Sequence, residues 1–325
     1  MSLGEFDIIR RYFQRDKLQS GVILGIGDDC AVVHLTKKNT GLAMTVDTLV
    51  AGKHFPADAT AADIASRSLC VNLSDLAAMG AIPQWFTLSL SLPEANESWL
   101  AEFSQSLFAV ADHFNCELVG GDTTCGPLSI TIQAQGSVPI DSYLKRSGAQ
   151  MGDHIFVTGS LGDGAAALAM LRNRLTVNNR ESDYLYRRFY RPEPQLAAAQ
   201  KLLGLSCTAI DISDGLLADL GHIASASQVA MVIDIDCLPL SPVLKMLYPQ
   251  QPQRVQQWAL AGGDDYQLAF TVPKKKLSAI KQLISTGELQ ATKIGIVKAG
   301  RGIECRLQGK PHPCDFEQGF QHFSD

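Results

Sequence analysis

The amino-acid sequence predicts an α/β (α+β) protein of two domains, in which mixed or antiparallel sheets are flanked by helices. Three observations support this prediction: segments that alternate between apolar and polar residues, segments with helical spacing between them, and a second series of both after residue 141. A length of 325 residues also favours two domains over one. We therefore expect an N-terminal α/β domain at residues 1–141 and a C-terminal α/β domain at residues 142–325.

The first domain alternates between expected strands and helices. In chain order we expect a strand at 42–46, a helix at 61–79, a strand at 86–92, a helix at 96–114 and a strand at 128–135. The first strand ends at Asp47, and Gly80 stops the first helix. The second face of the alternating strands carries Ser, Thr and Gln, so it is a face that another subunit could cover.

The second domain continues with a series of strands and helices. We expect strands at 155–158, 208–212, 230–235 and 266–272, and helices at 165–174, 183–190 and 215–226. Both domains contain Gly-Gly-Asp after an apolar run, at 120–122 and at 262–264. This hints at two related halves, although a single short match carries little weight.

Composition excludes several classes of function. The net charge is −5 and the longest basic run is Lys274-Lys275-Lys276, so we expect no nucleic-acid partner. No apolar run approaches the ~20 residues of a membrane span and the N-terminus lacks a signal-peptide pattern, so we expect a cytoplasmic protein with no membrane partner. The 8 cysteines form no Cys-x-x-Cys pair and are expected to be reduced thiols, and the 7 histidines show no zinc-binding spacing.

Short acidic motifs recur where an apolar run gives way to glycine or to a helix. They are Gly27-Asp28-Asp29, Thr45-Val46-Asp47, Asn72-Leu73-Ser74-Asp75, Gly120-Gly121-Asp122, Asp211-Ile212-Ser213-Asp214 and Gly262-Gly263-Asp264-Asp265. Aspartate is a short, stiff metal ligand, and glycine lets the backbone approach a bound group. Carboxylates that converge repel one another by several kcal/mol unless cations lie between them. The pattern therefore predicts a site for several Mg²⁺ ions that hold a polyphosphate.

Each motif also has a purely structural interpretation. Gly27-Asp28 is ordinary turn chemistry, and Gly120-Gly121 suits a glycine turn. Asp214 suits the N-cap of the following helix, but an N-cap does not explain Asp211, whereas a metal ion suits both.

Three further features are ambiguous. The glycine-rich segment 159–164 looks like a phosphate loop but lacks a Walker ending, so we interpret it as a strand-to-helix turn near the nucleotide. Lys145-Arg146 suits either a phosphate clamp or an exposed basic pair. His54 lies in a loop after Asp47, where it is either a structural histidine or a part of the site.

Taken in order, the motifs resemble those of one family. They read GIGDDCA at 25–31, VDT at 46–48, NLSDLAAMG at 72–80, GGDTT at 120–124, RSGA at 146–149, DISDGL at 211–216 and GGDDY at 262–266. Together they closely resemble the thiamine-monophosphate kinase family, of the aminoimidazole-ribonucleotide-synthetase-like superfamily. The resemblance runs from residue 4 to about residue 323, and its combined specificity is high although each motif is weak alone.

The resemblance implies a fold, an assembly and a reaction. The fold is the two-domain type of that superfamily, and the N-terminal sheets of two subunits pair in a homodimer. The reaction is the ATP- and Mg²⁺-dependent phosphorylation of thiamine monophosphate to thiamine diphosphate by direct in-line transfer, the last step of thiamine diphosphate biosynthesis. The N-terminal domain then carries the metal and phosphate site, and the C-terminal domain completes the nucleotide and substrate site.

The resemblance also implies roles for individual residues. The implied Mg²⁺ ligands are Asp29, Thr45, Asp47, Asp75, Asp122, Asp211 and Asp214, the nucleotide contacts are Gly121, Arg146 and Ser213, and the substrate contacts are His54, Asp264 and Phe320. Two positions depart from the family pattern. Asp264 stands where Glu is common, which shortens its reach, and Phe320 stands where relatives carry Tyr or Trp, which keeps ring stacking but loses a polar group.

The implied acceptor is a phosphate monoester, whose second pKa of about 6 makes it mostly a dianion at neutral pH. We therefore expect no catalytic base or nucleophile in the protein, because the metal ions neutralise and align the two phosphates. The alternatives are an amidine-forming synthetase of the same superfamily, a non-catalytic protein that binds ATP or thiamine diphosphate, and a Mg²⁺-dependent phosphatase. Selenophosphate-synthetase and hydrogenase-maturation relatives fit less well, because residues 1–29 and the C-terminal residue include no cysteine.

Overall fold

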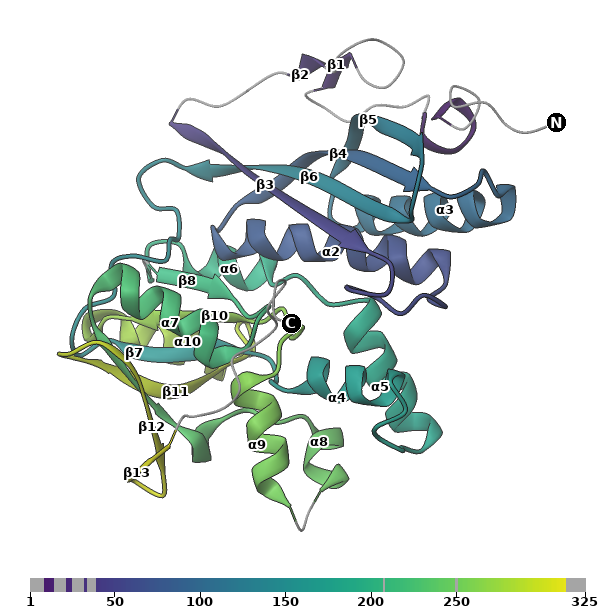
Figure 1. Cartoon of the computed structure of the whole chain (residues 1–325). Coiled ribbons are helices and arrows are strands. Elements are labelled where there is room, and N and C mark those ends of the chain that lie inside the picture. Colours follow the sequence, from purple (N-terminus) through teal and green to yellow (C-terminus); the bar gives the residue numbers. More distant parts are fainter. Residues whose placement is uncertain are drawn as a thin grey trace. The chain divides into compact units, whose positions relative to one another are not determined.

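The computed structural model of the chain describes residues 9–14, 22–24, 32–33, 39–206, 208–248 and 251–313 (Figure 1). The chain divides into two compact units. Unit 1 comprises Met1–Leu76 and Ala81–Asp141, and unit 2 comprises Ala77–Gly80 and Ser142–Asp325. Each unit has its own sheet with flanking helices, so the predicted α/β fold class is confirmed.

The main sheet of unit 1 has the strand order β3-β6-β4-β5. Its strands are β3 (Thr40–Val50), β4 (Ile82–Leu92), β5 (Glu117–Cys125) and β6 (Ser129–Pro139), and the shorter elements before them are η1 (Ile9–Phe13), β1 (Val22–Leu24) and β2 (Val32–Val33). Strands β3 and β4 run antiparallel to β6, whereas β5 runs parallel to β4, so the sheet is mixed. Helices α2 (Ala61–Ala78) and α3 (Glu97–His113) cover one face (Figure 1).

The covered face of this sheet is apolar. Leu69, Leu73 and Leu76 on α2 are at most 1% exposed, and burial of each such side chain contributes about 1.5–3 kcal/mol. Gly80, with φ of 69°, ends α2 as predicted, because glycine adopts the left-handed conformation at little cost. Asn96 caps α3 by accepting the Trp99 N–H at 3.0 Å.

The other face of β3 is exposed and also apolar. Leu42, Met44 and Val46 alternate with inward-facing residues, and their side chains are 40%, 63% and 60% exposed. β3 does not end at Asp47, as we predicted from its acidic end, but continues to Val50. Asp47 therefore lies within a strand, where the pairing with β6 fixes the direction of its side chain.

The sheet of unit 2 has the strand order β13-β12-β9-β11-β7-β10-β8. Its strands are β7 (His154–Thr158), β8 (Thr208–Asp211), β9 (Ala230–Asp234), β10 (Leu268–Val272), β11 (Ala291–Lys298), β12 (Gly302–Leu307) and β13 (Lys310–His312). Neighbouring strands are antiparallel except β12 and β9. The helices are α4 (Asp163–Leu171), α5 (Asn179–Tyr190), α6 (Leu196–Leu202), α7 (Leu216–Ser227), α8 (Pro242–Leu247), α9 (Pro252–Ala261), α10 (Leu277–Ser285), and the short η2 (Ile235–Cys237) and η3 (Lys274–Lys276).

Strand β10 lies between two apolar cores, which explains why it is buried throughout. Ala269 belongs to a core that includes Leu216 and Leu220 of α7. Its neighbour Phe270 belongs to a second core with Leu202 of α6. The strand thus positions the loop before it, 262–266, against both layers of the unit.

Several element boundaries differ from the predicted ones. Helix α5 begins at Asn179 rather than at 183, because Asn178 and Glu181 form a capping box that the sequence pattern already contained. Helix α4 begins at Asp163 rather than at 165. The Gly120-Gly121-Asp122 motif lies inside β5 and not in a turn after it.

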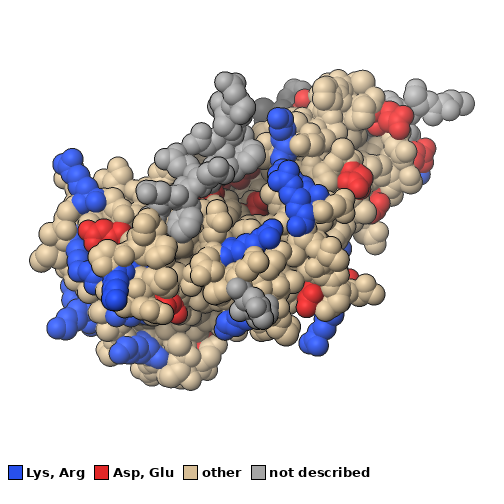
Figure 2. Space-filling view, turned by 60° about the horizontal axis from the view of Figure 1, so that its bottom comes forward, with Lys and Arg blue, Asp and Glu red and all other residues tan. Residues whose placement is uncertain are grey.

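Among the described residues, Cys70, Cys116, Cys125 and Cys237 are free thiols, as predicted, whereas Cys305 is disulfide-bonded, so the prediction was wrong for Cys305. No described helix is both long enough and apolar enough to cross a membrane. On the face shown in Figure 2, lysine and arginine side chains are dispersed among acidic ones, in keeping with the net charge of −5.

Candidate active site

Three of the predicted metal ligands lie on one face of the sheet in unit 1. Thr45 and Asp47 alternate with exposed residues on β3, so their side chains share a face. The Thr45 hydroxyl donates to Oδ2 of Asp75 on α2 at 2.5 Å. Burial, and then the charge of Asp75, raise the pKa of Asp47 to about 6. A bound cation neutralises the repulsion between a partly buried carboxylate and a second carboxylate, so this face suits a metal ion.

Strand β5 places its two predicted site residues differently. A Cβ on Gly121 would lie 1.9 Å from the Leu88 carbonyl oxygen, so only glycine permits this approach of β5 to β4. Gly121 pairs with Leu88 on β4, and Leu88 lies in the same cross-strand row of the sheet as Asp47 on β3. Asp122 pairs with Ser89, one row further along, and is exposed. The register thus does not place Asp122 in the row of Asp47, and its side chain is open to solvent.

His54 is held at three points within unit 1. The ring atom Nδ1 of His54 accepts the Val50 backbone N–H at 3.0 Å. The backbone N–H of His54 donates to the Val50 carbonyl at 3.0 Å. The guanidinium of Arg67 donates to the His54 carbonyl at 3.2 Å. Because Nδ1 is an acceptor, the neutral ring carries its proton on Nε2, which makes that atom a hydrogen-bond donor. Such a donor suits a phosphate oxygen.

In unit 2, the turn between β8 and α7 carries the next group of predicted residues. One oxygen of Asp219 accepts the backbone N–H groups of Ser213, Asp214 and Gly215 at 3.1, 3.2 and 3.1 Å. The N-cap position of α7 is Gly215 and no side chain caps this helix, so Asp214 does not act as the side-chain cap, and Asp219 instead holds the turn before the helix. Burial, and then the charges of Asp211 and Asp214, raise the pKa of Asp219 to about 8.

The loop before β10 lies directly on this turn. A Cβ on Gly263 would lie 2.2 Å from the Ser213 carbonyl oxygen. Asp264 donates its N–H to the same carbonyl at 2.9 Å, and Tyr266 donates its N–H to the Ile212 carbonyl at 2.8 Å. Both Asp264 and Tyr266 are in the left-handed region, with φ of 65° and 50°, which costs about 1–3 kcal/mol for each non-glycine residue. This cost has to be offset by the surrounding contacts.

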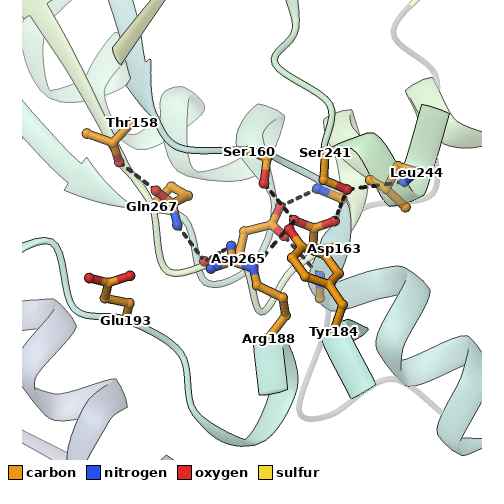
Figure 3. Close-up of polar contacts among 12 residues, drawn as sticks. Thr158, Ser160, Asp163, Tyr184, Arg188, Glu193, Ser241, Leu244, Asp265 and Gln267 are labelled. Carbon is orange, nitrogen blue, oxygen red and sulfur yellow. Dashed lines mark hydrogen bonds and ion pairs between the residues drawn. The ribbon is translucent and has the colours of Figure 1, made fainter. Parts of the chain in front are cut away.

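The glycine-rich segment 159–164 has no amides left for a phosphate at its centre. The Gly162 and Gly164 N–H groups donate to the two carboxylate oxygens of Asp265 at 2.7 and 3.0 Å (Figure 3). The turn interpretation is therefore correct for this segment, and its anion-binding capacity is taken by the protein's own carboxylate. Burial raises the pKa of Asp265 to about 7, although the two amides lower it.

Arg146 lies exposed beside β8, the strand that leads to Asp211. The preceding residue, Lys145, forms a bridge with Thr208, and its carbonyl accepts the Ala209 N–H at 3.1 Å. The backbone of Arg146 therefore follows directly on a residue that pairs with the Asp211 strand, within unit 2.

Comparisons with known proteins identify the family of this chain. Residues 27–138 match the family model "AIR synthase related protein, N-terminal domain", and residues 150–308 match "AIR synthase related protein, C-terminal domain". The thiamine-monophosphate kinase of Escherichia coli (strain K12) is 46% identical over 327 residues, which cover 100% of this chain and 99% of that protein. The chain belongs to the thiamine-monophosphate kinase family.

Solved structures of family members agree over both units. Thiamine-monophosphate kinase from Stenotrophomonas maltophilia K279a gives a TM-score of 0.83 at 42% identity and covers 96% of this chain and 99% of its own. The structure of AaThiL complexed with AMPPCP and TMP gives a TM-score of 0.78 at 29% identity and covers 98% of this chain and 96% of its own. The two-domain fold implied by the motifs is thus the fold of this family of phosphotransferases.

Two of the residues that the family resemblance implies, Asp29 and Phe320, lie outside the described residues. Among the others, unit 1 brings together Thr45, Asp47 and Asp75, and unit 2 brings together the Asp211–Asp214 turn and Asp264. Their donor atoms are carboxylate and hydroxyl oxygens, the ligands that Mg²⁺ prefers, so the residues fit the ion. Within the described ranges, no group of three or more His, Cys, Asp and Glu side chains gathers closely enough to hold a metal by itself.

Two buried aspartates were missed by reasoning from the sequence. Asp219 lies in the first turn of α7, where an acidic residue is ordinary, and Asp265 follows the predicted contact Asp264 directly. No local signal distinguishes them from exposed acids, because their hydrogen-bond donors come from other segments. Asp219 binds backbone N–H groups in the turn of the predicted ligand Asp214, whereas Asp265 binds those of Gly162 and Gly164 at the start of α4.

Proposed function

We propose that this protein is a kinase that transfers the γ-phosphoryl group of ATP to thiamine monophosphate and forms thiamine diphosphate. The observation that carries the proposal is the 46% identity to the E. coli thiamine-monophosphate kinase over 100% of this chain. A relative of the same fold, AaThiL, has been solved in complex with AMPPCP and TMP, an ATP-like nucleotide and a ligand of the proposed class.

The proposed metal ligands are Asp29, Thr45, Asp47, Asp75, Asp122, Asp211 and Asp214. The proximity of Asp47 and Asp75 supports this assignment, because burial and the neighbouring charge together raise the pKa of Asp47 to about 6. Bound Mg²⁺ ions supply charge neutralisation and alignment of the two phosphates. The carboxylates fix where those charges sit, and they do so before the substrates arrive because strand pairing holds β3 rigid.

The protein supplies no base in this proposal. The acceptor phosphate, with a second pKa of about 6, is already mostly a dianion at neutral pH. His54 binds instead of abstracting a proton, since its Nδ1 is taken by the Val50 N–H and its Nε2 is a donor. Asp264 and Phe320 are proposed as further substrate contacts, and Gly121, Arg146 and Ser213 as nucleotide contacts.

The division of labour follows the predicted domains. Residues 1–141 are proposed to carry most metal ligands and the dimerisation sheet, and residues 142–325 to complete the nucleotide and substrate site. The apolar outer face of β3, formed by Leu42, Met44 and Val46, supports a homodimer, because exposed apolar side chains gathered on a strand mark an interaction surface. A charged substitution such as Met44→Glu is expected to halve the mass measured by sedimentation equilibrium. An unchanged mass would remove this face from the proposal.

A single set of assays tests the proposed function. Protein, ATP and Mg²⁺ are incubated with thiamine monophosphate, with thiamine, or with no acceptor, and thiamine diphosphate, ADP and inorganic phosphate are measured. With thiamine monophosphate as acceptor, the kinase forms thiamine diphosphate and ADP in equal amounts. With thiamine as acceptor, thiamine diphosphate appears only after thiamine monophosphate has formed. Release of inorganic phosphate without an acceptor would indicate a phosphatase, and binding without turnover would indicate a non-catalytic binding protein. A cytoplasmic location follows from the use of ATP and is checked by cell fractionation.

A further inference from the structure

Asp265 is an almost completely buried carboxylate beside the predicted contact Asp264, and the proposed reaction does not use it. Its side chain is 1% exposed, and each of its oxygens accepts one backbone N–H from the segment that starts α4. Helix α4 has no cap of its own, since Gly162 provides no side chain. Asp265 therefore caps this helix from a distant point in the sequence.

The segment that carries Asp265 is packed backbone to backbone on both sides. A Cβ on Gly164 would lie 2.5 Å from the carbonyl oxygens of Gly263 and Asp264, so the start of α4 touches one side of the segment. A Cβ on Gly263 would lie 2.2 Å from the Ser213 carbonyl oxygen, so the turn after β8 touches the other side. Residues 263–264 are thus enclosed between the two.

The two neighbours of Asp265 hold unusual backbone conformations. Asp264 and Tyr266 have φ of 65° and 50°, and the Tyr266 hydroxyl donates to Oδ1 of Asp264 at 3.0 Å. Left-handed conformations of non-glycine residues persist only where the surroundings fix them. The N–H groups of Asp264 and Tyr266 bond to carbonyls of the turn after β8, and the carboxylate of Asp265, bonded at both oxygens, holds the residue between them on the side of α4.

A second buried aspartate keeps the receiving segment in place (Figure 3). Asp163 is 0% exposed and accepts the hydroxyl groups of Ser160 at 2.6 Å, Ser241 at 2.6 Å and Tyr184 at 2.8 Å. The Arg188 guanidinium lies 3.4 Å from Asp163 and also 3.4 Å from the Asp265 carbonyl oxygen. The amides that receive Asp265 therefore belong to a rigid segment.

We propose that Asp265 is a positioning residue, which holds the 263–266 segment against the Gly162 and Gly164 amides and so aims the Asp264 carboxylate at the thiamine moiety of the substrate. The inference rests on the proposed function and deepens it. The Asp264 side chain is short, so the direction of its carboxylate is set by the backbone more than by the reach of the side chain.

The proposal separates the two substrates. The Ser213–Gly215 turn is held independently by three N–H bonds to Asp219, so loss of Asp265 leaves the nucleotide side of the site in place. The effect of a substitution should therefore fall on thiamine monophosphate and spare ATP. A residue with a merely structural role would weaken both alike.

The test compares Asp265→Ala and Asp265→Asn with a matched control, Asp153→Ala. Asp153 is likewise buried in unit 2, at 5% exposure, and accepts one backbone N–H, from Gln150 at 3.0 Å, but it lies outside the candidate site. We expect both Asp265 variants to raise KM for thiamine monophosphate at least tenfold and KM for ATP less than twofold. The control is expected to lower Tm without changing either KM.

Chemical rescue adds a readout that a structural role would not move. In Asp265→Ala the two amides at the start of α4 face a space of carboxylate size, and formate at tens of millimolar is expected to lower KM for thiamine monophosphate again. Asp264→Ala, which keeps Asp265, is expected to gain nothing from formate. Sodium chloride at the same concentration controls for ionic strength.

The outcomes are distinct. If the wild-type protein does not form thiamine diphosphate, the proposed function fails, and Asp265 is then judged by calorimetric binding of thiamine monophosphate alone. If the wild type is active but the Asp265 variants raise both KM values equally, or neither, the positioning role is wrong. If neither variant folds, as judged by circular dichroism, Asp265 serves folding and the proposal is likewise overturned.

Discussion

Asp47 in unit 1, which is partly buried, and Asp265 in unit 2, which is buried, are both aspartates with raised pKa values, but their neighbours are opposite in kind. Burial and then the charge of Asp75 raise the pKa of Asp47 to about 6. Burial raises the pKa of Asp265 to about 7, while the amides of Gly162 and Gly164 lower it. One carboxylate faces another carboxylate, and the other faces hydrogen-bond donors.

The difference separates a metal ligand from a structural carboxylate. A raised pKa by itself indicates only that the charged form is disfavoured. Asp47 leaves a negative field that a cation can neutralise, whereas Asp265 is satisfied by the backbone and has nothing further to bind. The turn after β8 contains both kinds of carboxylate. Asp219 is bonded to three amides and is structural, whereas Asp211 and Asp214 are the candidate metal ligands.

The largest effect is expected at Asp122, which extends the comparison to an exposed carboxylate. Asp122→Asn removes a proposed ligand charge and should lower kcat/KM by at least about a hundredfold. Its side chain is exposed on β5, so the Tm measured by differential scanning fluorimetry should stay the same. A fully active Asp122→Asn enzyme would refute its assignment as a ligand.

The comparison itself predicts opposite effects on stability. In EDTA at pH 7.5, Asp47→Asn removes a charge that is disfavoured by burial and then by the charge of Asp75, and should raise the free energy of unfolding by up to about 3 kcal/mol, since the pKa is shifted from 3.8 to about 6. Asp265→Asn replaces an acceptor oxygen by an NH₂ group that faces a backbone N–H. This substitution should lower the free energy of unfolding by about 1–3 kcal/mol.

Urea unfolding followed by circular dichroism measures both changes. Asp153→Ala in unit 2 is the control for the loss of an ordinary buried acceptor. Changes of the same sign in Asp47→Asn and Asp265→Asn would show that the two carboxylates are equivalent, and the distinction between ligand and structural aspartate would then be wrong.

A smaller effect is expected at Asp219, whose role depends on its acceptor oxygen and not on a metal. Asp219→Ala frees three amides of the Ser213–Gly215 turn and should raise the Mg²⁺ concentration for half-maximal activity about tenfold, as is usual for groups that orient metal ligands. Asp219→Asn keeps an acceptor oxygen and should raise it clearly less. Equal effects of the two variants would contradict a role through these hydrogen bonds.

The smallest expected effect is a dependence of the Mg²⁺ requirement on pH, caused by protonation of Asp47. Its pKa of about 6 means that half of the carboxylate is protonated at pH 6, so the Mg²⁺ concentration for half-maximal activity should be about twice that at pH 8 and rise further below pH 6. Because the folded-state pKa is raised from 3.8, the stabilisation by this proton is full below pH 3.8 and lost as the pH rises through about 6. The metal-free protein should therefore lose this contribution over that range, whereas Asp47→Asn should not.

Much of the fold could be predicted from local patterns. The alternating segments 86–92 and 128–135 became β4 and β6, and the helix expected at 61–79 became α2 with Gly80 at its end. These predictions succeeded because, in a strand or helix with one buried face, the apolar residues recur with the period of that element. Boundaries were less certain, and the capping box at Asn178 was overlooked although it is a local signal.

The glycine and aspartate motifs were harder to place. The structural interpretation of Gly120 and Gly121 was a turn, but they lie within β5, because Gly121 serves a close approach to the Leu88 carbonyl and not a reversal of the chain. Asp47 was expected at a strand end and lies inside β3. Glycine marks both turns and close contacts, and only the neighbouring strand decides between them.

By itself, the sequence determined the fold class, the family and the set of aspartates among which the ligands are sought. Only the tertiary structure decided which aspartate has which role. The Asp265 carboxylate meets amides 103 and 101 residues away, and Thr45 meets Asp75 across 30 residues. The function of a carboxylate depends on the charges and donors around it, and in this protein those come from segments that the sequence keeps far apart.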